Sequence, residues 1–250
     1  LVPLNVVKEF DLKSYSPQRF GVRDLFFEVR IKNLSSRLNK RLAFGKLDEV
    51  FFRVYWISPG KYKLEVVGLP PGFTSLKAEL KNMIKDKLDY VIPRNISTGL
   101  RSYKLSIEKS RGKHVIVECL DPTNSKAINK IRLFFEKSGK LTKIQKVMPG
   151  GMDTNDYILE KKSWSHNKWV ITSLLKKRRL NRLRENNVDT EIKYLEIDGY
   201  GFPKQITIKS NYRIGNNKKT RKDLSFETKL ELTNYRINKG IAYRAIVRKR

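Results

Sequence analysis

Apolar and polar residues alternate with a period of two along most of this chain. In Leu25–Lys32 the odd positions are apolar and most of the even positions are charged. The same alternation returns over 102–108, 205–209, 226–232 and 241–247. Because successive side chains of a β-strand point to opposite faces, the pattern predicts strands with one apolar face and one solvated face.

The segment Val50–Ile57 is apolar on both of its faces, which predicts a central strand. Ser58-Pro59-Gly60 is a turn signal, and 62–67 then predicts the hairpin partner of that strand. Ten to twelve such strands, mostly joined by short links, predict one antiparallel sheet. A sheet of that size curls or closes, because its strands twist.

One segment, 74–92, has apolar residues at helical spacing instead, and Pro93 follows it. A second, weaker helix is predicted over 173–185. The predicted fold is therefore mainly β (α+β), with a single large curved antiparallel sheet that forms an incomplete barrel and carries the first helix in its concave mouth. Residues 1–21 contain prolines and are expected to be irregular, and 22–250 to form one domain, because no Pro/Gly/Ser-rich linker interrupts them.

The charge balance narrows the class of partner. The chain has 54 Lys and Arg against 25 Asp and Glu, a formal net charge of +29. Such a surface attracts polyanions at long range and loses that attraction in salt. Nucleic acid, anionic lipid headgroups and lipopolysaccharide phosphates all fit, and charge alone does not choose among them.

Catalytic, metal and cofactor signals are absent from the sequence. No G-x-S-x-G, P-loop or H-E-x-x-H motif occurs, so we expect a non-enzyme without a cofactor. Cys119 is the one cysteine, which excludes an internal disulfide, and with only His114 and His166 beside it no closed zinc site can form. Cys119 lies in an apolar run and is predicted to be a buried core residue. Trp164 and Trp169 flank His166, which predicts a hairpin turn with a Trp on each arm or, alternatively, the rim of a cavity.

No stretch approaches the roughly 18 apolar residues that a membrane-spanning helix needs. The chain begins at Leu1 and not at Met, so we expect that a leader could have been removed before it.

The C-terminal half carries a family resemblance. Tyr194–Ile208 reads as a strand, an Asp198-Gly199 turn, an aromatic-Pro step and a second strand, and Thr228–Asn238 follows it. This succession resembles the outer-membrane lipoprotein carrier family, the LolA-like and LolB-like proteins, over roughly 191–238. The resemblance implies an unclosed antiparallel half-barrel with helices in its mouth and an apolar cavity for acyl chains. The long N-terminal helix of that family is not apparent in 1–21.

The resemblance implies a periplasmic protein, soluble or lipid-anchored, that binds a lipid or the acyl groups of a lipoprotein without covalent chemistry. Its expected partners are acyl chains, an anionic membrane surface and lipoprotein-sorting proteins of the inner or outer membrane, and we expect a monomer. An ordinary core filled by the helix is the alternative for the apolar face. The candidate cavity residues are Leu25, Phe27, Val29, Ile31, Phe52, Val54, Trp56, Leu80, Ile84, Leu88 and Trp169.

The basic clusters are candidates for docking on an anionic surface, where each Lys or Arg contributes about 1 kcal/mol. Solvated loops are the plainer interpretation. A basic scaffold that binds nucleic acid or another polyanion remains an alternative function, although these clusters lack the interleaved aromatic residues of single-strand binders. A lipoprotein-sensing regulatory domain is a further alternative. The candidate docking residues are Lys176, Lys177, Arg178, Arg179, Lys218, Lys219 and Arg221.

Overall fold

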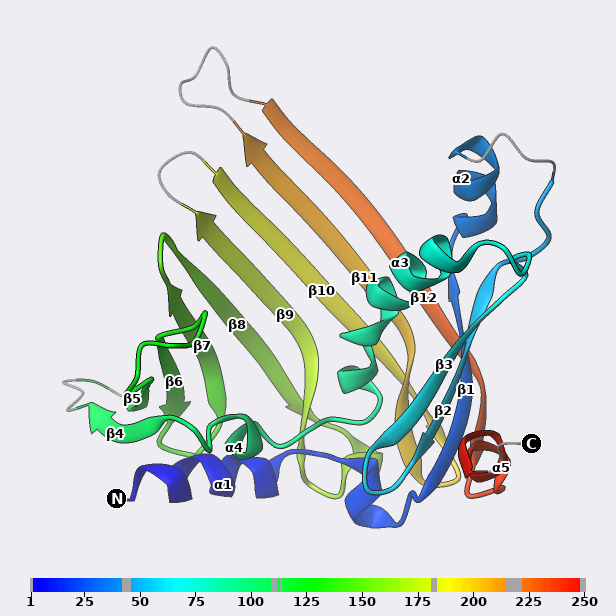
Figure 1. The fold of residues 1–250 in the computed structure, drawn as a ribbon. Coiled ribbons are helices and arrows are strands. Elements are labelled where there is room, and N and C mark those ends of the chain that lie inside the picture. Colours follow the sequence, from blue (N-terminus) through cyan, green and yellow to red (C-terminus); the bar gives the residue numbers. More distant parts are fainter. Residues whose placement is uncertain are drawn as a thin grey trace. The chain divides into compact units, whose positions relative to one another are not determined.

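The computed structural model describes residues 2–41, 46–108, 112, 114–180, 184–214 and 222–247 (Figure 1). They contain twelve strands in one sheet, hydrogen-bonded in the order β3-β2-β1-β12-β11-β10-β9-β8-β7-β6-β5-β4. β3 and β4 stand at the two ends of this order, so across the described ranges the sheet is not closed. The mainly β fold with one unclosed antiparallel sheet is thereby confirmed. The strands are β1 (Asp24–Ile31), β2 (Phe51–Ile57), β3 (Lys61–Val67), β4 (Lys104–Glu108), β5 (His114–Leu120), β6 (Lys130–Glu136), β7 (Leu141–Met148), β8 (Gly151–Lys161), β9 (Trp169–Leu180), β10 (Arg184–Ile197), β11 (Tyr200–Ile214) and β12 (Lys222–Ile237).

Five α-helices and three short 3-10 helices accompany the described strands. The amphipathic helix predicted over 74–92 is present as α3 followed by η2, with Leu76, Leu80 and Ile84 buried. The helical elements are α1 (Pro3–Lys13), η1 (Pro17–Phe20), α2 (Leu34–Arg41), α3 (Thr74–Lys85), η2 (Leu88–Tyr90), α4 (Ile96–Gly99), η3 (Ser163–Ser165) and α5 (Ile241–Val247).

The chain groups into two compact units, each assembled from separate stretches of sequence. Unit 1 comprises Leu1–Tyr15, Arg94–Ile192 and Thr207–Glu227. Unit 2 comprises Ser16–Pro93, Lys193–Ile206 and Thr228–Arg250. The strands β10, β11 and β12 contribute residues to both units, which is why no linker marks a boundary in the sequence.

The first segment is helical where the sequence predicted irregular structure. Pro3 occupies the first turn of α1, where its missing N–H costs no hydrogen bond. No side chain caps this helix, so Pro3 is the one local signal of its start. Tertiary contacts hold it instead: Val7 and Phe10 are buried, and the Asp11 carboxylate accepts the backbone N–H of Ile96 at 2.8 Å and of Ser97 at 3.0 Å.

Two further segments differ from prediction. The expected weak helix over 173–185 is β9 instead, which pairs with β8 on one side and β10 on the other. The expected strand over 241–247 is the helix α5. Its first N–H groups, those of Ala242 and Tyr243, donate to the Asp24 carboxylate at 3.4 and 2.6 Å. In both segments a tertiary partner overrides the local pattern.

Unit 2 has an aromatic core. The ring of Tyr235 stacks between Phe27 and Phe202, with ring centroids 5.2 and 4.8 Å away. The Tyr235 hydroxyl donates to the Pro203 carbonyl at 2.6 Å, and burial raises its pKa well above the ordinary value. The Asp198-Gly199 turn joins β10 to β11, as its sequence predicts, with positive φ at both residues.

Candidate functional site: a partly covered sheet face in unit 1

The strand register of unit 1 shows which side chains share a face. Val117 pairs with Leu133, Leu133 pairs with Ile144, and Ile144 pairs with Asn155. Asn155 then pairs with Lys176 on β9. We call the face that carries these residues the helix face, because α1 packs against it.

At one end the helix face is a closed hydrophobic core. Val7 and Phe10 of α1 pack there, and the Phe10 ring lies 5.9 Å from that of Phe135. Cys119 is fully buried in this core, and burial raises its pKa to about 12, as expected for an inert core thiol. The other buried members of this core are Val6, Leu100, Val117, Ile131, Leu133, Leu141, Ile144 and Leu159.

At the other end, the hairpin of β11 and β12 carries exposed apolar side chains on one face. Ser225 donates to Asn211 at 2.7 Å and Arg213 donates to Asp223 at 3.3 Å, so these four residues share the polar face. By alternation, the residues between them lie on the opposite face. These are Tyr212, Ile214, Leu224 and Phe226, with exposed fractions of 38%, 48%, 44% and 57%.

The exposed apolar residues lie on the helix face. Arg213 on the polar side of the hairpin pairs with Glu185 at 3.5 Å, and Glu185 stands opposite Arg179 in the β9–β10 register. Arg179 and Arg178 are neighbours in a strand and point to opposite faces. Arg178 belongs to the helix face, so the apolar side of the hairpin belongs to it as well. We call the apolar set Tyr212, Ile214, Leu224 and Phe226 the open apolar patch.

A polar cluster lies on the helix face of β7, β8 and β9. Asp153 is nearly buried and stands opposite Lys146 on β7 and Arg178 on β9. Both Asp153 oxygens accept a hydrogen bond from the Arg178 guanidinium at 2.7 Å, and the Lys176 ammonium lies 3.7 Å away. The Arg178 hydrogen bond, opposed by burial, lowers the Asp153 pKa. We call Lys146, Asp153, Lys176 and Arg178 the charged cluster.

Three polar side chains lie beside the charged cluster on the same face. Asn155 donates from Nδ2 to the Tyr157 hydroxyl at 3.4 Å, and burial raises the Tyr157 pKa. Asn186 stands opposite Arg178. The Oδ1 atoms of Asn155 and Asn186 are buried and accept no hydrogen bond from the residues that the structure describes. Buried acceptors without a donor are rare in native structures and call for an explanation.

Most of the candidate cavity residues lie in unit 2. Leu25 pairs with Trp56 and Phe27 pairs with Val54, so the predicted common face is real. Nine of these side chains, all except Leu88 and Trp169, are at most 7% exposed. Water has almost no access to them, so an acyl chain would reach them only after displacement of a side chain or helix.

Leu88 and Trp169 are half-buried, and Trp169 belongs to unit 1. Trp169 packs at the edge of the unit 1 core, with the ammonium groups of Lys140 and Lys161 at 5.3 and 4.7 Å from its ring centroid. A short connection between β8 and β9 is present as predicted, but only Trp169 stands on a strand arm, since Trp164 lies within η3. Trp164 contacts Tyr15 edge-on at 5.0 Å.

The basic run 176–179 divides between two faces. Lys176 and Arg178 lie on the helix face, whereas Lys177 and Arg179 are exposed on the opposite face. The candidate docking residues Lys218, Lys219 and Arg221 fall outside the described residues.

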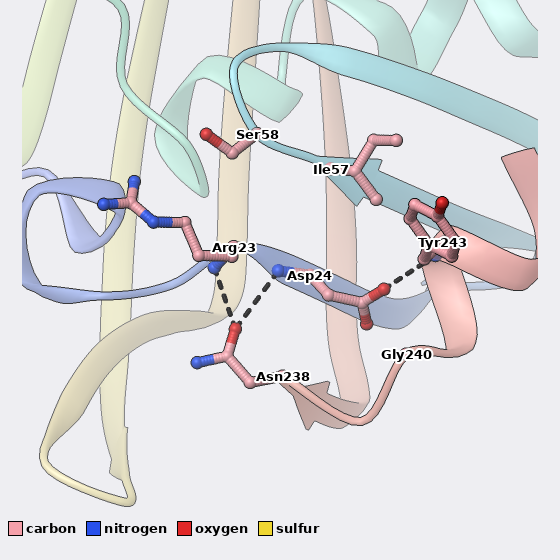
Figure 2. A pocket seen from close by; sticks show the side chains of 7 residues that line it. All are labelled: Arg23, Asp24, Ile57, Ser58, Asn238, Gly240 and Tyr243. Atoms are coloured by element: carbon pink, nitrogen blue, oxygen red, sulfur yellow. Dashed lines mark hydrogen bonds between the residues drawn. The ribbon is translucent and has the colours of Figure 1, made fainter. Parts of the chain in front are cut away.

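A cavity of about 510 Å³ lies in unit 2 (Figure 2). The Asn238 amide oxygen accepts the backbone N–H of Arg23 at 2.8 Å and of Asp24 at 3.1 Å, and the Asp24 carboxylate accepts from α5. These polar groups hold β1, the end of β12 and α5 together, so the cavity is best explained as a structural joint. Its lining residues are Arg23, Asp24, Ile57, Ser58, Asn238, Gly240 and Tyr243.

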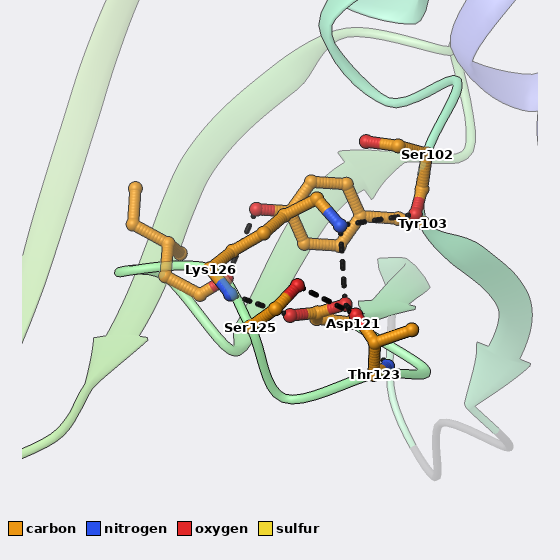
Figure 3. Close-up of polar contacts among 7 residues, drawn as sticks. Ser102, Tyr103, Asp121, Thr123, Ser125 and Lys126 are labelled. Atoms are coloured by element: carbon orange, nitrogen blue, oxygen red, sulfur yellow. Dashed lines mark hydrogen bonds and ion pairs between the residues drawn. The ribbon is translucent and has the colours of Figure 1, made fainter.

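A second polar constellation, around Asp121 in unit 1, is also structural (Figure 3). The Asp121 carboxylate accepts the backbone N–H of Thr123 and of Lys126 and pairs with the Lys126 ammonium at 3.1 Å. Burial alone would raise the pKa of Asp121, but these donors outweigh it and hold the pKa well below the usual range. The Tyr103 hydroxyl donates a hydrogen bond to the backbone carbonyl of Ile128 in the same loop.

In the described part of the chain, no three His, Cys, Asp or Glu side chains gather as metal ligands. Within the same ranges no helix is both long and apolar enough to cross a bilayer.

Sequence reasoning missed the open apolar patch and, in the charged cluster, Lys146 and Asp153, whereas Lys176 and Arg178 were among the candidate docking residues. Alternation of apolar with polar residues is visible in both arms of the hairpin, but buried and exposed strand faces have the same alternation. For the charged cluster the signal is Asp153 and Arg178 on neighbouring strands, which becomes visible only when the register is known.

Comparisons with known proteins give two weak structural similarities. No family model and no curated protein matches this chain. A "putative outer membrane lipoprotein-sorting protein domain" from Vibrio parahaemolyticus aligns with a TM-score of 0.34 and 11% identity, over 95% of this chain and 93% of that chain. MucB in its complex with MucA(peri) aligns with a TM-score of 0.18 and 10% identity, over 97% and 94%. Scores this low do not establish a family for the chain.

Proposed function

We propose that this chain is a non-catalytic binding protein for an amphiphile, a lipid or the acyl group of a lipoprotein, which it holds on the helix face of unit 1. The observation that carries the proposal is the open apolar patch. Four apolar side chains share one face with a buried core and yet are 38–57% exposed. Clusters of exposed apolar side chains beside polar residues are typical of binding sites.

Burial of the acyl chain supplies the affinity in this proposal. Each methylene removed from water contributes about 0.8 kcal/mol, so ten methylenes contribute about 8 kcal/mol before the entropic costs of binding. The acyl chain lies along Tyr212, Leu224 and Phe226, and the exposed apolar surface of these side chains is buried at the same time. No bond is made or broken, which agrees with the raised pKa of the buried Cys119 thiol.

The finer assignment is a periplasmic carrier that takes up its ligand from a membrane and passes it on to a sorting partner. The positive net charge of +29 favours encounter with an anionic bilayer. Native mass spectrometry of protein purified from its own cells tests this assignment directly. Co-purified lipid supports it, and a ligand-free protein opposes it.

The binding test uses a lysophosphatidylcholine with a fluorescent acyl chain, kept below its critical micelle concentration. The native protein binds it, and the double variant Leu224→Ser/Phe226→Ser binds at least about tenfold more weakly, because about 1.4 kcal/mol is a factor of ten. Both side chains are exposed, so the thermal midpoint stays within a few degrees of the native value.

Leu12→Ser is the matched control, because Leu12 is also an exposed apolar residue of unit 1 but lies on α1, outside the open apolar patch. Its affinity for the probe stays at the native value. Equal affinities of all three proteins, or no binding by the native protein, would refute the proposal.

Polyanion binding is the second candidate, because Lys177 and Arg179 present exposed cations on the face opposite to the open apolar patch. The salt dependence of the binding affinity distinguishes the two candidate functions. Binding of a single-stranded oligonucleotide weakens steeply between 50 and 200 mM salt, whereas binding of a neutral amphiphile does not. A tight oligonucleotide complex together with no uptake of the acyl probe would favour this second candidate.

A further inference from the structure

The charged cluster has an excess of positive charge on the helix face. Three cations, Lys146, Lys176 and Arg178, surround the single carboxylate of Asp153, which leaves a net charge of +2. Arg178 and Lys176 share that carboxylate, whereas Lys146 forms no hydrogen bond or ion pair with any described residue. The cluster therefore lacks an anion that a self-contained ion-pair network would include.

The position of Lys146 strengthens this point. Burial lowers the pKa of Lys146, and the nearby Lys176 and Arg178 charges lower it further against the opposing effect of Asp153. A half-buried ammonium beside two other cations is costly for the isolated protein. A bound anion relieves that cost, and such perturbed groups are common at functional sites.

The neighbouring amides add a second kind of signal. Asn155 stands opposite Lys176, and Asn186 stands opposite Arg178. The Oδ1 atom of each amide is buried without a donor. A ligand that brings hydroxyl donors together with a negative charge satisfies the amides and the cations at once.

Apolar side chains adjoin the charged cluster on the same face. The half-buried Tyr157 on β8 pairs with the half-buried Leu174 on β9, whereas Ile144 on β7 is buried in the unit 1 core. All three belong to the face that continues across unit 1 to the open apolar patch. A molecule with an anionic head and an acyl chain therefore finds the charged cluster and partly exposed apolar side chains on one face.

We propose that Lys146, Lys176 and Arg178 bind the phosphate of a hydroxyl-bearing anionic headgroup, such as that of a phosphatidylglycerol, with Asn155 and Asn186 accepting its hydroxyl groups. This inference rests on the proposed function, because the same face holds the acyl chain. It assigns to the binding protein a preference for anionic over zwitterionic lipids.

The experiment compares three probes on the full chain by fluorescence titration and calorimetry. They are lysophosphatidylglycerol, lysophosphatidylcholine with the same acyl chain, and glycerol phosphate without an acyl chain. The native protein binds the first at least about tenfold more tightly than the second, because the positive cluster repels the choline cation and the glycerol hydroxyls can donate to Asn155 and Asn186. Lys146→Gln weakens the binding of lysophosphatidylglycerol more than that of lysophosphatidylcholine, because both headgroups carry a phosphate but only the first has a net negative charge, and it reduces this ratio to about threefold or less.

Two variants serve as controls. Lys177→Gln removes an exposed cation from the same strand as Lys176 but from the opposite face, and it keeps the native ratio. Lys146→Arg retains the charge and also keeps the ratio. Lys146→Gln removes a charge that is costly in the free protein and Lys146→Arg retains it, so neither variant has a thermal midpoint clearly below the native value.

The outcomes separate the two proposals. Equal binding of both lysolipids overturns the headgroup inference but leaves the acyl-binding function intact. Failure to bind either lysolipid overturns the proposed function itself. Glycerol phosphate binding as tightly as lysophosphatidylglycerol identifies an anion site without a lipid and overturns the inference as stated.

Discussion

The strand β1 of unit 2 and the hairpin β11–β12 in unit 1 have the same alternating pattern but differ in burial. In unit 2, Leu25 and Phe27 of β1 share a sheet face with Phe52 of β2, and all three are almost completely buried. In unit 1, Leu224 and Phe226 of the hairpin are about half exposed. Alternation therefore indicates which residues share a face, but not whether that face ends up as core or as binding surface.

The largest expected effect contrasts two phenylalanines, one from each region. Phe27→Ala lowers the free energy of unfolding by about 3–5 kcal/mol, because it leaves a cavity in a packed core. Phe226→Ala changes it by less than about 0.5 kcal/mol. Urea denaturation measures both. Similar losses at the two positions would mean that the hairpin is covered in solution and would remove the basis of the proposed site.

A smaller effect is expected for Asp153→Asn. This substitution lowers the stability of unit 1 but strengthens the binding of the anionic lipid. The variant loses the paired hydrogen bonds to Arg178 and is destabilised by about 1–3 kcal/mol. It also raises the net charge of the charged cluster by one, so lysophosphatidylglycerol binds more tightly. Denaturation and titration of the same variant measure the two changes, and weaker binding would contradict the headgroup inference.

The Asp153 carboxyl also predicts a pH dependence. Its pKa in the folded protein is lowered, so it contributes stability above the unfolded pKa, and this contribution is lost as pH falls through the lowered folded value. In the range below about pH 4, the ordinary pKa of Asp, the urea midpoint of the native protein therefore decreases with falling pH more steeply than that of Asp153→Asn. Parallel midpoints would show that this ion pair does not form in solution.

The smallest effect concerns Lys146 at high pH. Asp153, Lys176 and Arg178 face its ammonium, and its pKa in the free protein is lowered from the ordinary value. The preference for lysophosphatidylglycerol therefore weakens as pH rises through that lowered pKa, before ordinary lysines titrate. Lys146→Arg keeps the preference over the same pH range. An identical pH profile for both proteins would exclude Lys146 from the headgroup site.

Much of the fold followed from local pattern. The alternation in Leu25–Lys32 and the turn before 62–67 predicted β1 and the β2–β3 hairpin, and the Asp198-Gly199 signal marked the β10–β11 turn. Two of the failures, at α1 and α5, share one cause. α1 and α5 are held by the carboxylates of Asp11 and Asp24, and such distant partners leave no trace in a local pattern.

The candidate site was less predictable than the fold. Apolar residues of β1 and β2 were chosen for a cavity, with a core filled by the helix over 74–92 as the alternative, but a sequence pattern does not indicate how much space remains between sheet and helix. The basic run 176–179 was treated as one surface, although a strand divides it between two faces. Lys146 and Arg178 come together only through the register of three strands.

The burial of Cys119 makes the chain convenient for site-specific labelling. A thiol with a pKa of about 12 supplies almost no thiolate at neutral pH, and no path leads a reagent to it while the core is intact. A cysteine introduced at an exposed position, as in Phe226→Cys, is therefore modified alone by a maleimide dye. The native sequence thus permits fluorescence and spin-label measurements at the hairpin without prior removal of its own cysteine.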